Sequence, residues 1–255
     1  MNPVHTIDFP GRLFKIEPHP SGEALVVELR GAAERVVRLA WVELEAEGKC
    51  EFGPEMEWWC GLERVYVAGV LVHRFEDPNL PVHRGLEWWS LPGFGLQWRA
   101  PGARLLGALQ DGLWVGMVDG SEGVLDLEAG VLRGDDEGEW ESEAKGFEEE
   151  RFQHMGLPES RASAEYSDIP RLSALPSVTG TVSTLELDGQ TLIAWHSEQA
   201  AGGFCLWLAA LENGVEKWLI CLEKDLQKLN PEPFFVLKQH VIWLSGPNSL
   251  SWRKL

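Results

Sequence analysis

Short apolar blocks, many with apolar and polar residues alternating, recur along the chain and are separated by turn residues. Alternation with a period of two places every second side chain on one face of a sheet, so these blocks predict β-strands. No helical periodicity extends convincingly beyond about 12 residues, and the best short candidate, 222–229, stops before Pro231. The predicted strands are 24–29, 36–44, 65–72, 113–118, 192–195, 204–211, 217–222 and 234–244.

Dipeptides that adopt a positive φ lie between these blocks and predict tight hairpin turns. Consecutive hairpins make the expected sheets predominantly antiparallel. The prolines of Pro231–Phe235 exclude that segment from a central strand, so it is expected to introduce the final strand pair. The turn dipeptides are Asp111-Gly112, Asp119-Gly120, Asp188-Gly189 and Asn213-Gly214.

A weak internal repeat consists of an apolar strand ending in Leu, a short turn and a Gly, at Gly48, Gly95, Gly130 and Gly214. If one copy is skipped before the last, the spacing averages roughly 40–45 residues, the length of a four-stranded propeller blade. Two copies continue to Trp98 and Trp218. This pattern resembles the blade signature of quinoprotein-type propellers, which implies an indole packed between neighbouring blades.

The repeat and the hairpins together predict a single all-β domain over residues 1–255. The expected fold is antiparallel and propeller-like, with about five or six irregular blades; a large β-sandwich or an open barrel is the alternative. In a circular fold, the C-terminal strands would meet the block at 24–29 and remove the open sheet edge.

The net charge of the chain excludes some classes of binding partner. The chain has 40 Asp and Glu against 22 Lys and Arg, a net charge of −18, so neither nucleic acid nor an anionic membrane surface is an expected partner. Its longest uncharged apolar runs, 65–72 and 203–211, are far shorter than the roughly 20 residues of a membrane span. Without a signal-peptide core, and with four cysteines that form no CxxC pair, the sequence predicts a bacterial-type cytoplasmic protein with free thiols.

An acidic run at 134–150 contains nine acids and one Lys, and a polar segment at 151–176 follows it. Because runs of like charge extend into solvent, the run is expected to be a solvated loop that covers one sheet edge. Binding of a basic partner or a divalent cation is the alternative.

The most specific polar stretch is the proline-stiffened connection from His73 to Gly85. His73, Asp77 and His83 could converge on a transition metal, since imidazole and carboxylate are suitable ligands. Imidazoles that bond backbone carbonyls and fix an irregular loop explain the same residues, and this reading is preferred. No cofactor and no metal are therefore expected.

Glu-Trp-Trp occurs twice, at Glu57–Trp59 and Glu87–Trp89. Adjacent residues of a strand point to opposite faces, so one indole of each pair is expected in the core. An exposed indole beside a carboxylate could stack on a sugar, and two carboxylates about 5–10 Å apart could hydrolyse a glycoside. Packing is the preferred role for these indoles.

The segment from Glu57 to Trp98, with Trp58–Leu62, Val70–Phe75, Asp77–Pro81 and His83–Gly85, resembles a bacterial family known only as a domain of unknown function. Pro231–Phe235 adds to the resemblance, which implies a match over the full length and assigns no activity.

Motifs for phosphate loops, dinucleotide binding, zinc proteases, nucleophile elbows and EF-hands do not occur in the sequence. We therefore expect a non-enzymatic binding or scaffold protein, with an unknown protein or small molecule as partner and no catalytic residue assigned. The alternative is a hydrolase of a small or glycosidic substrate that uses carboxylates and histidines of the 57–87 region. The candidate ligand-binding residues are His73, Asp77, His83, Arg84, Glu57, Trp59, Glu87 and Trp89.

Overall fold

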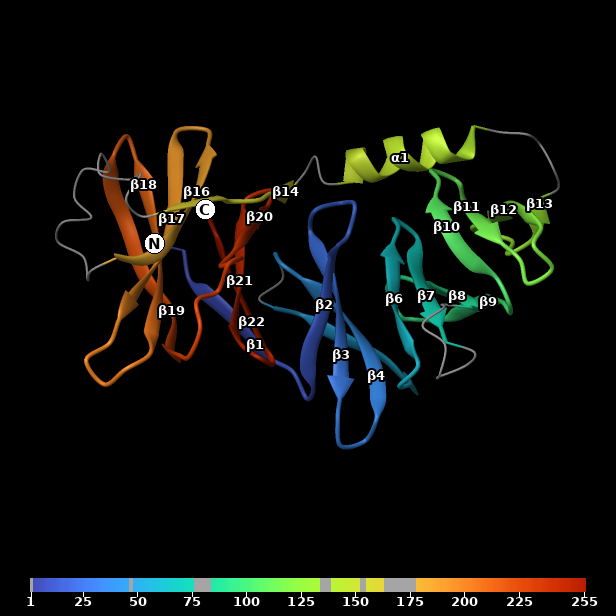
Figure 1. Cartoon of the computed structure of the whole chain (residues 1–255), viewed down its shortest axis with the longest axis horizontal. Coiled ribbons are helices and arrows are strands. Elements are labelled where there is room, and N and C mark those ends of the chain that lie inside the picture. The colour runs from blue at the N-terminus through green and yellow to red at the C-terminus, as the bar shows by residue number, and fades with distance from the viewer. Residues whose placement is uncertain (1, 46–47, 76–83, 134–138, 152–154, 163–177) are drawn as a thin grey trace. The chain divides into compact units, whose positions relative to one another are not determined.

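The computed structural model describes residues 2–45, 48–75, 84–133, 139–151, 155–162 and 178–255. These residues form β-strands and one helix (Figure 1). The chain divides into two compact units, a middle unit, Phe9–His154, and a terminal unit, Met1–Asp8 with Met155–Leu255.

The middle unit contains three antiparallel sheets of four consecutive strands: sheet I (β2–β5), sheet II (β6–β9) and sheet III (β10–β13). Each sheet is a simple meander, as the predicted hairpin turns require. The strands are β2 (Arg12–Pro18), β3 (Ala24–Gly31), β4 (Val36–Glu43), β5 (Cys50–Glu57), β6 (Cys60–Val65), β7 (Gly69–Arg74), β8 (Leu86–Ser90), β9 (Leu96–Ala100), β10 (Arg104–Ala108), β11 (Gly112–Gly116), β12 (Glu122–Asp126) and β13 (Leu132–Arg133).

The terminal unit contains two antiparallel sheets of five strands: sheet IV, in the order β1-β22-β21-β20-β14, and sheet V, β15–β19. The strands are β1 (Val4–Asp8), β14 (Met155–Gly156), β15 (Glu159–Ala162), β16 (Val178–Leu187), β17 (Gln190–Glu198), β18 (Phe204–Glu212), β19 (Val215–Leu226), β20 (Phe235–Leu237), β21 (His240–Gly246) and β22 (Ser249–Lys254).

The two ends of the chain meet in sheet IV, where β1 pairs with β22 from Val4 opposite Arg253 to Asp8 opposite Ser249. The expectation that the C-terminal strands meet residues 24–29 is wrong, because that block is β3, which already pairs on both sides with β2 and β4.

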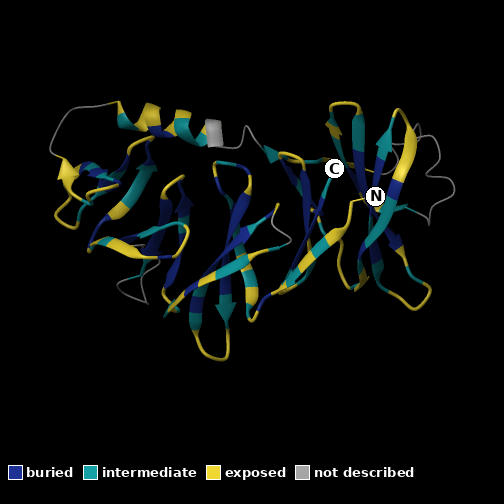
Figure 2. Cartoon of the chain, turned by 180° about the vertical axis from the view of Figure 1, so that it is seen from behind, coloured by how far each residue is buried: buried dark blue, intermediate teal, exposed yellow. Residues whose placement is uncertain are grey.

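Apolar side chains fill the space between successive sheets in each unit, and Figure 2 colours these buried positions dark blue. One cluster joins sheets I and II, a second joins sheets II and III, and a third joins sheets V and IV. Both tryptophans of the repeat contribute to this packing. Trp98 of β9 donates a 2.8 Å hydrogen bond to the carbonyl of Leu127 beyond β12, and Trp218 of β19 packs with Val236 and Trp243 of sheet IV.

The all-β, antiparallel prediction is confirmed: the described residues form five sheets of four or five strands, the size of propeller blades, rather than the two sheets of a sandwich or the single sheet of a barrel. All four repeat glycines lie in the connection to the last strand of their sheet, before β5, β9, β13 and β19. Asn213 and Gly214 have φ values of 50° and 73°, as the β18–β19 turn requires.

Three local predictions are wrong. The block 65–72 contains the end of β6, a turn and most of β7, because an all-apolar stretch carries no alternation that would reveal a break. The block 234–244 likewise contains β20, a turn and β21. The helix candidate 222–229 overlaps β19, which continues to Leu226.

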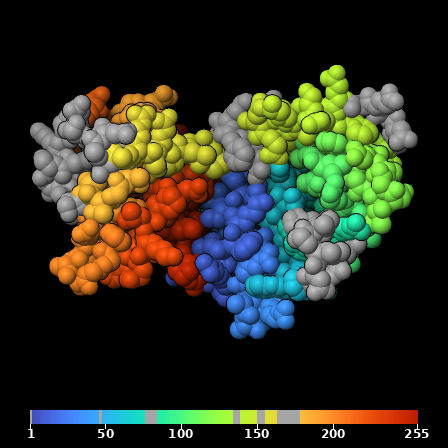
Figure 3. Space-filling model, in the orientation of Figure 1, coloured from blue at the N-terminus to red at the C-terminus, as the bar shows by residue number. Residues whose placement is uncertain are grey.

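The helix α1 (Trp140–Arg151) occupies most of the run expected to be a solvated loop. It packs against β10, the edge strand of sheet III, as Figure 3 shows in yellow-green against green. Ala144 is buried against Gly107, and the ring of Phe147 stacks on Tyr66 with 5.8 Å between centroids. Anchoring by these side chains explains why the acidic segment folds onto the sheet instead of extending into solvent.

Candidate functional site

The predicted ligand-binding residues that the structure describes belong to sheet II and its borders. Glu57 is the last residue of β5, and Trp59 lies in the two-residue turn before β6. Arg84 lies two residues before the start of β8. Asp77 and His83 lie outside the described residues, so the convergence of His73, Asp77 and His83 stays a prediction. The described residues contain no group of three or more His, Cys, Asp or Glu that could hold a metal.

The pleat of sheet II separates His73 from Glu87. His73 pairs with Leu86, whereas Val72 pairs with Glu87, and directly paired residues share a face of the sheet. Trp88 and Trp89 likewise point to opposite faces, and Trp88 is buried, as predicted. Trp58 and Trp59 form a turn instead of a strand, so the alternation expected for them does not apply.

Glu87 is 1% exposed and lies at the centre of a saturated polar network. Its carboxylate accepts a 2.8 Å bond from Arg74 and a 3.1 Å bond from the indole of Trp89, and it forms a 3.0 Å ion pair with Arg99. The other end of the Arg74 guanidinium donates to Glu57 at 2.5 Å. Glu57 and Glu87 therefore share one guanidinium, which is an arrangement for holding strands together.

The thiol of Cys60 lies buried near this network, and burial is the main reason that its pKa is raised to about 11, with nearby Arg74 opposing the shift. Cys60 is therefore a neutral thiol at physiological pH, which makes it a poor nucleophile.

On the opposite face, the buried His73 has Nδ1 at 2.7 Å from a carboxylate oxygen of Glu63 and packs edge-on against Phe75, with 5.5 Å between ring centroids. Glu63 is the extra, unpaired residue of a β-bulge in β6, where the register with β7 shifts. The bulge directs its side chain toward His73, so tertiary structure supplies a partner that the sequence analysis did not name.

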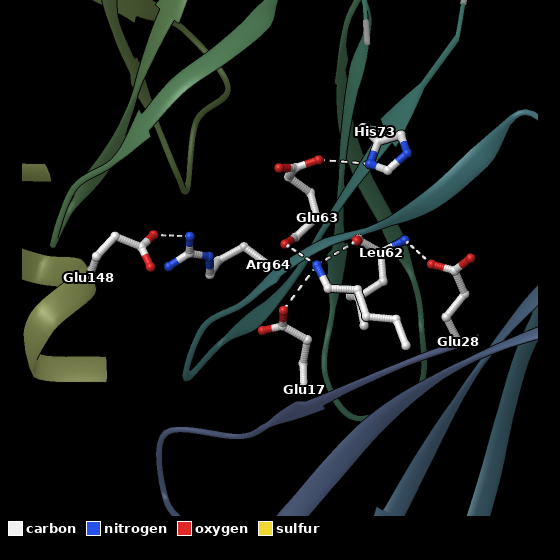
Figure 4. Close-up of polar contacts among 8 residues, drawn as sticks. Glu17, Glu28, Leu62, Glu63, Arg64, His73 and Glu148 are labelled. Atoms are coloured by element: carbon white, nitrogen blue, oxygen red, sulfur yellow. Dashed lines mark hydrogen bonds and ion pairs between the residues drawn. The ribbon is translucent and has the colours of Figure 1, made fainter. Parts of the chain in front are cut away.

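Charged side chains from sheet I fasten the free edge of β6 (Figure 4). Lys15 donates to the carbonyls of Leu62 and Glu63 at 3.1 and 3.0 Å and pairs with Glu17 at 3.0 Å. The buried carboxylate of Glu28 accepts the Leu62 amide at 2.8 Å. These bonds satisfy backbone groups that another strand would otherwise pair with, so this part of the edge is protected.

Beside this edge lies a surface that the sequence analysis missed. Glu28 also holds Arg30 through a 2.7 Å hydrogen bond, and Arg30 donates to the carbonyls of Trp58 and Cys60 at 2.9 and 3.2 Å. The guanidinium carbon lies 4.3 Å from the ring centroid of Phe14 and 5.0 Å from that of Trp58. Phe14 is the residue passed over at the bulge in β2, and it is 65% exposed.

Arg30 and His73 approach each other over Gly61, because a Cβ there would lie 2.7 Å from the His73 ring and 3.4 Å from the guanidinium. Phe75 in turn donates its amide to the carbonyl of Trp59 at 2.8 Å. These contacts join one continuous surface, called the Arg30 surface here. It consists of Phe14, Arg30, Trp58, Trp59, His73 and Phe75. Only the double Trp and His73 stood out in the sequence; Phe14 and Arg30 come from strands far from them in the chain.

A family described as Domain of unknown function (DUF4905) matches residues 19–91, which span β3 to β8 and include Arg30 and the Glu57–Trp59 turn. The resemblance to a domain of unknown function is thus confirmed for that part of the chain, and Pro231–Phe235 lies outside the match. No curated protein matches the chain. Among the described residues, no helix combines the length and apolarity needed to cross a membrane.

Proposed function

We propose that this chain is a non-enzymatic binding protein that docks a protein partner on the Arg30 surface. The observation that carries the proposal is Phe14, a large apolar side chain 65% exposed, lying against a guanidinium that three hydrogen-bond acceptors hold in place. Exposed apolar side chains that gather in one patch, as Phe14 and Trp59 do here, mark interaction surfaces.

The composition of the surface suits protein recognition. Arginine and large aromatic residues dominate the binding energy of protein interfaces, because they combine apolar area with directed polar groups. Arg30 is already oriented by Glu28 and the carbonyls of Trp58 and Cys60, so docking would cost it little rotamer entropy. Trp59, 36% exposed in the adjacent turn, extends the apolar area that a partner side chain would cover.

The pairing of the ionisable groups favours binding over the hydrolase alternative. A glycosidase needs one carboxyl group to act as an acid and another to act as a base or nucleophile. Here Arg74 pairs with both Glu57 and Glu87, and Glu87 is almost wholly buried, so a substrate has little access to its carboxylate. All four cysteines carry free thiols, which supports placing this function in the reducing cytoplasm.

The test compares two exposed phenylalanines of the middle unit, each near an arginine. Phe14 lies beside Arg30, whereas the control, Phe52 on β5, is 42% exposed and lies 5.9 Å from the Arg38 guanidinium, outside the Arg30 surface. Tagged wild-type protein, Phe14→Ser and Phe52→Ser would each be used to retain partners from lysate of the source cells, with quantitative mass spectrometry as the readout.

We expect a protein retained by wild type and Phe52→Ser to be lost with Phe14→Ser, with affinity for that purified partner reduced by about 2 kcal/mol, roughly thirtyfold. Equal retention by all three proteins would contradict the proposed surface. Hydrolysis of chromogenic esters or glycosides that disappears in Glu57→Gln would overturn the non-enzymatic proposal itself.

A further inference from the structure

A shallow hollow of about 650 Å³, widely open to solvent, lies on the middle unit between sheet III and the start of α1. Its lining residues are Trp114, Glu122, Glu139, Trp140, Glu141, Ser142 and Lys145. The geometry points to a second binding site, in which an organic cation with an alkylammonium or guanidinium group is held against Trp114 and Trp140. This site is independent of the Arg30 surface.

Two indoles form one corner of the hollow. Trp114 of β11 and Trp140, the first residue of α1, have ring centroids 6.5 Å apart and planes inclined at 47°. Both side chains are half-buried, so each leaves part of its ring open. The face of an indole carries negative charge density and attracts cations, and two inclined faces can contact the same group.

Packing holds this corner in place from both sides. The indole nitrogen of Trp114 donates to Glu122 at 3.1 Å, which orients the ring and sets a carboxylate beside it. On the helix, a Cβ on Gly107 would lie 2.6 Å from that of Ala144, so only glycine allows α1 to lie this close to β10. Phe147 on Tyr66 and the ion pair of Glu148 with Arg64 hold the next turn of the helix.

The charge of the lining favours a cation. Glu122, Glu139 and Glu141 supply three carboxylates against one ammonium group, that of Lys145. Acids near a helix N-terminus also stabilise the helix dipole, and this accounts for Glu141 in the first turn and for Glu139 directly before the helix. Glu122 belongs to a strand of sheet III, where its carboxylate accepts the Trp114 indole, so the formation of the helix does not explain its presence there.

A neutral sugar could also stack on an indole, and hydroxyl groups could bond the same carboxylates. The excess of negative charge and the inclined pair of rings favour a compact cation over a flat sugar ring. A net charge of −18 on the whole chain adds a long-range attraction for cations that salt would weaken.

The experiment uses the full chain labelled with 5-fluorotryptophan, so that ¹⁹F NMR reports on Trp114 and Trp140 separately. The probes are choline, its uncharged carbon isostere dimethylbutanol, an arginine-containing peptide and methyl glucoside. Choline and the arginine peptide distinguish a small free cation from a basic side chain of a protein. We expect the cations to shift both resonances saturably and dimethylbutanol to leave them unchanged.

Two isosteric variants on α1 form the matched control. Glu141 lines the hollow, whereas Glu149 is exposed on the same helix away from it. Glu141→Gln should weaken choline binding roughly three- to tenfold, and Glu149→Gln should leave it unchanged. Trp140→Leu should weaken binding roughly two- to thirtyfold, with far-ultraviolet circular dichroism confirming that α1 is retained.

Equal shifts with choline and dimethylbutanol would reduce the site to an apolar hollow and overturn the proposal. Saturation by methyl glucoside without saturation by either cation would assign it to sugars instead. No response to any probe would also overturn it, and none of these outcomes bears on Phe14.

Discussion

The two units bury different kinds of polar group. In the middle unit the buried set includes Glu17, Glu28, Glu87 and Arg64, each paired with an opposite charge. In the described part of the terminal unit it consists of serines, two histidines and Arg253, and the ion pairs shown there, Arg161 with Glu159 and Lys217 with Glu212, lie at the surface.

The difference shows that the stacking of sheets does not require buried carboxylates. Sheets IV and V pack through apolar residues such as Leu192, Leu208 and Trp243. Buried ion pairs add little net stability because desolvation offsets their attraction, but losing one partner is costly. In the middle unit these pairs fasten a free strand edge and orient Arg30, so their role is positional.

The largest expected effect comes from breaking the Glu87 network. Glu87→Ala leaves Arg74 without its buried partner and the Trp89 indole without an acceptor. We expect the free energy of unfolding, measured in urea, to fall by about 3 kcal/mol. Glu57→Ala removes the exposed partner of the same arginine and should cost no more than about 1 kcal/mol. Equal costs for the two variants would contradict the central position of Glu87.

Removing a buried polar group from the terminal unit should lower the free energy of unfolding by less. The Ser251 hydroxyl lies 2.8 Å from those of Thr6 and Ser245. Ser251→Ala removes neutral hydrogen bonds only, and we expect a loss of about 1 kcal/mol by the same urea titration. A cost as large as that of Glu87→Ala would show that the distinction between charged and neutral buried groups has no energetic consequence.

Each unit also buries a histidine whose protonation a pH titration can follow, His196 in the terminal unit and His19 in the middle unit. Burial lowers the pKa of His196. Burial also lowers the pKa of His19, although the hydrogen bond that its ring donates to the Val67 carbonyl opposes the shift. Below pH 6.5, the ordinary pKa of histidine, these side chains take up protons in the unfolded chain more readily than in the folded chain. The stability that is present above pH 6.5 is therefore lost as the pH falls.

The melting temperature should therefore fall as the pH drops below 6.5, and it should fall less steeply in His196→Gln. Glutamine is chosen because its side-chain oxygen can accept the hydrogen bond that the Asn230 amide donates to His196 Nε2. An unchanged slope in that variant would rule out His196 as a source of the pH dependence.

The smallest expected effect on stability is at the Arg30 surface. Phe14→Ser and Phe52→Ser both replace exposed rings, so each should change the free energy of unfolding by about 0.5 kcal/mol or less. A much larger loss in Phe14→Ser would mean that the ring supports Arg30 structurally, and its loss of partner binding would then have to be measured again with Trp59→Ser.

Local chemistry made much of the fold predictable. Asn213-Gly214 and Asp188-Gly189 lie at the turns where they were expected, since their preference for positive φ does not depend on distant residues. The break between β6 and β7 was missed because Tyr66, Val67 and Ala68 carry no turn signal. The helix α1 was missed because it has only one buried residue in its described part, Ala144, too few to produce a period.

The candidate site was predictable only in part. Glu57, Trp59, His73, Glu87 and Trp89 do lie in one region, because they belong to consecutive strands of one sheet and its border. Their grouping into two networks on opposite faces follows from the pleat, and their partners Arg30, Glu63 and Phe14 arrive through bulges and through packing between sheets.

By itself, the sequence determined the all-β class, many of the strands and hairpin turns, and the repeat before the last strand of sheets I, II, III and V, because these depend on alternation and on the φ preferences of neighbouring residues. Tertiary structure alone decided which charges are buried, where α1 lies, and that Phe14 and Trp58 meet at one guanidinium. Those outcomes depend on contacts between residues far apart in the chain, such as Arg30 with Trp58 and Arg64 with Glu148, and no local pattern encodes them.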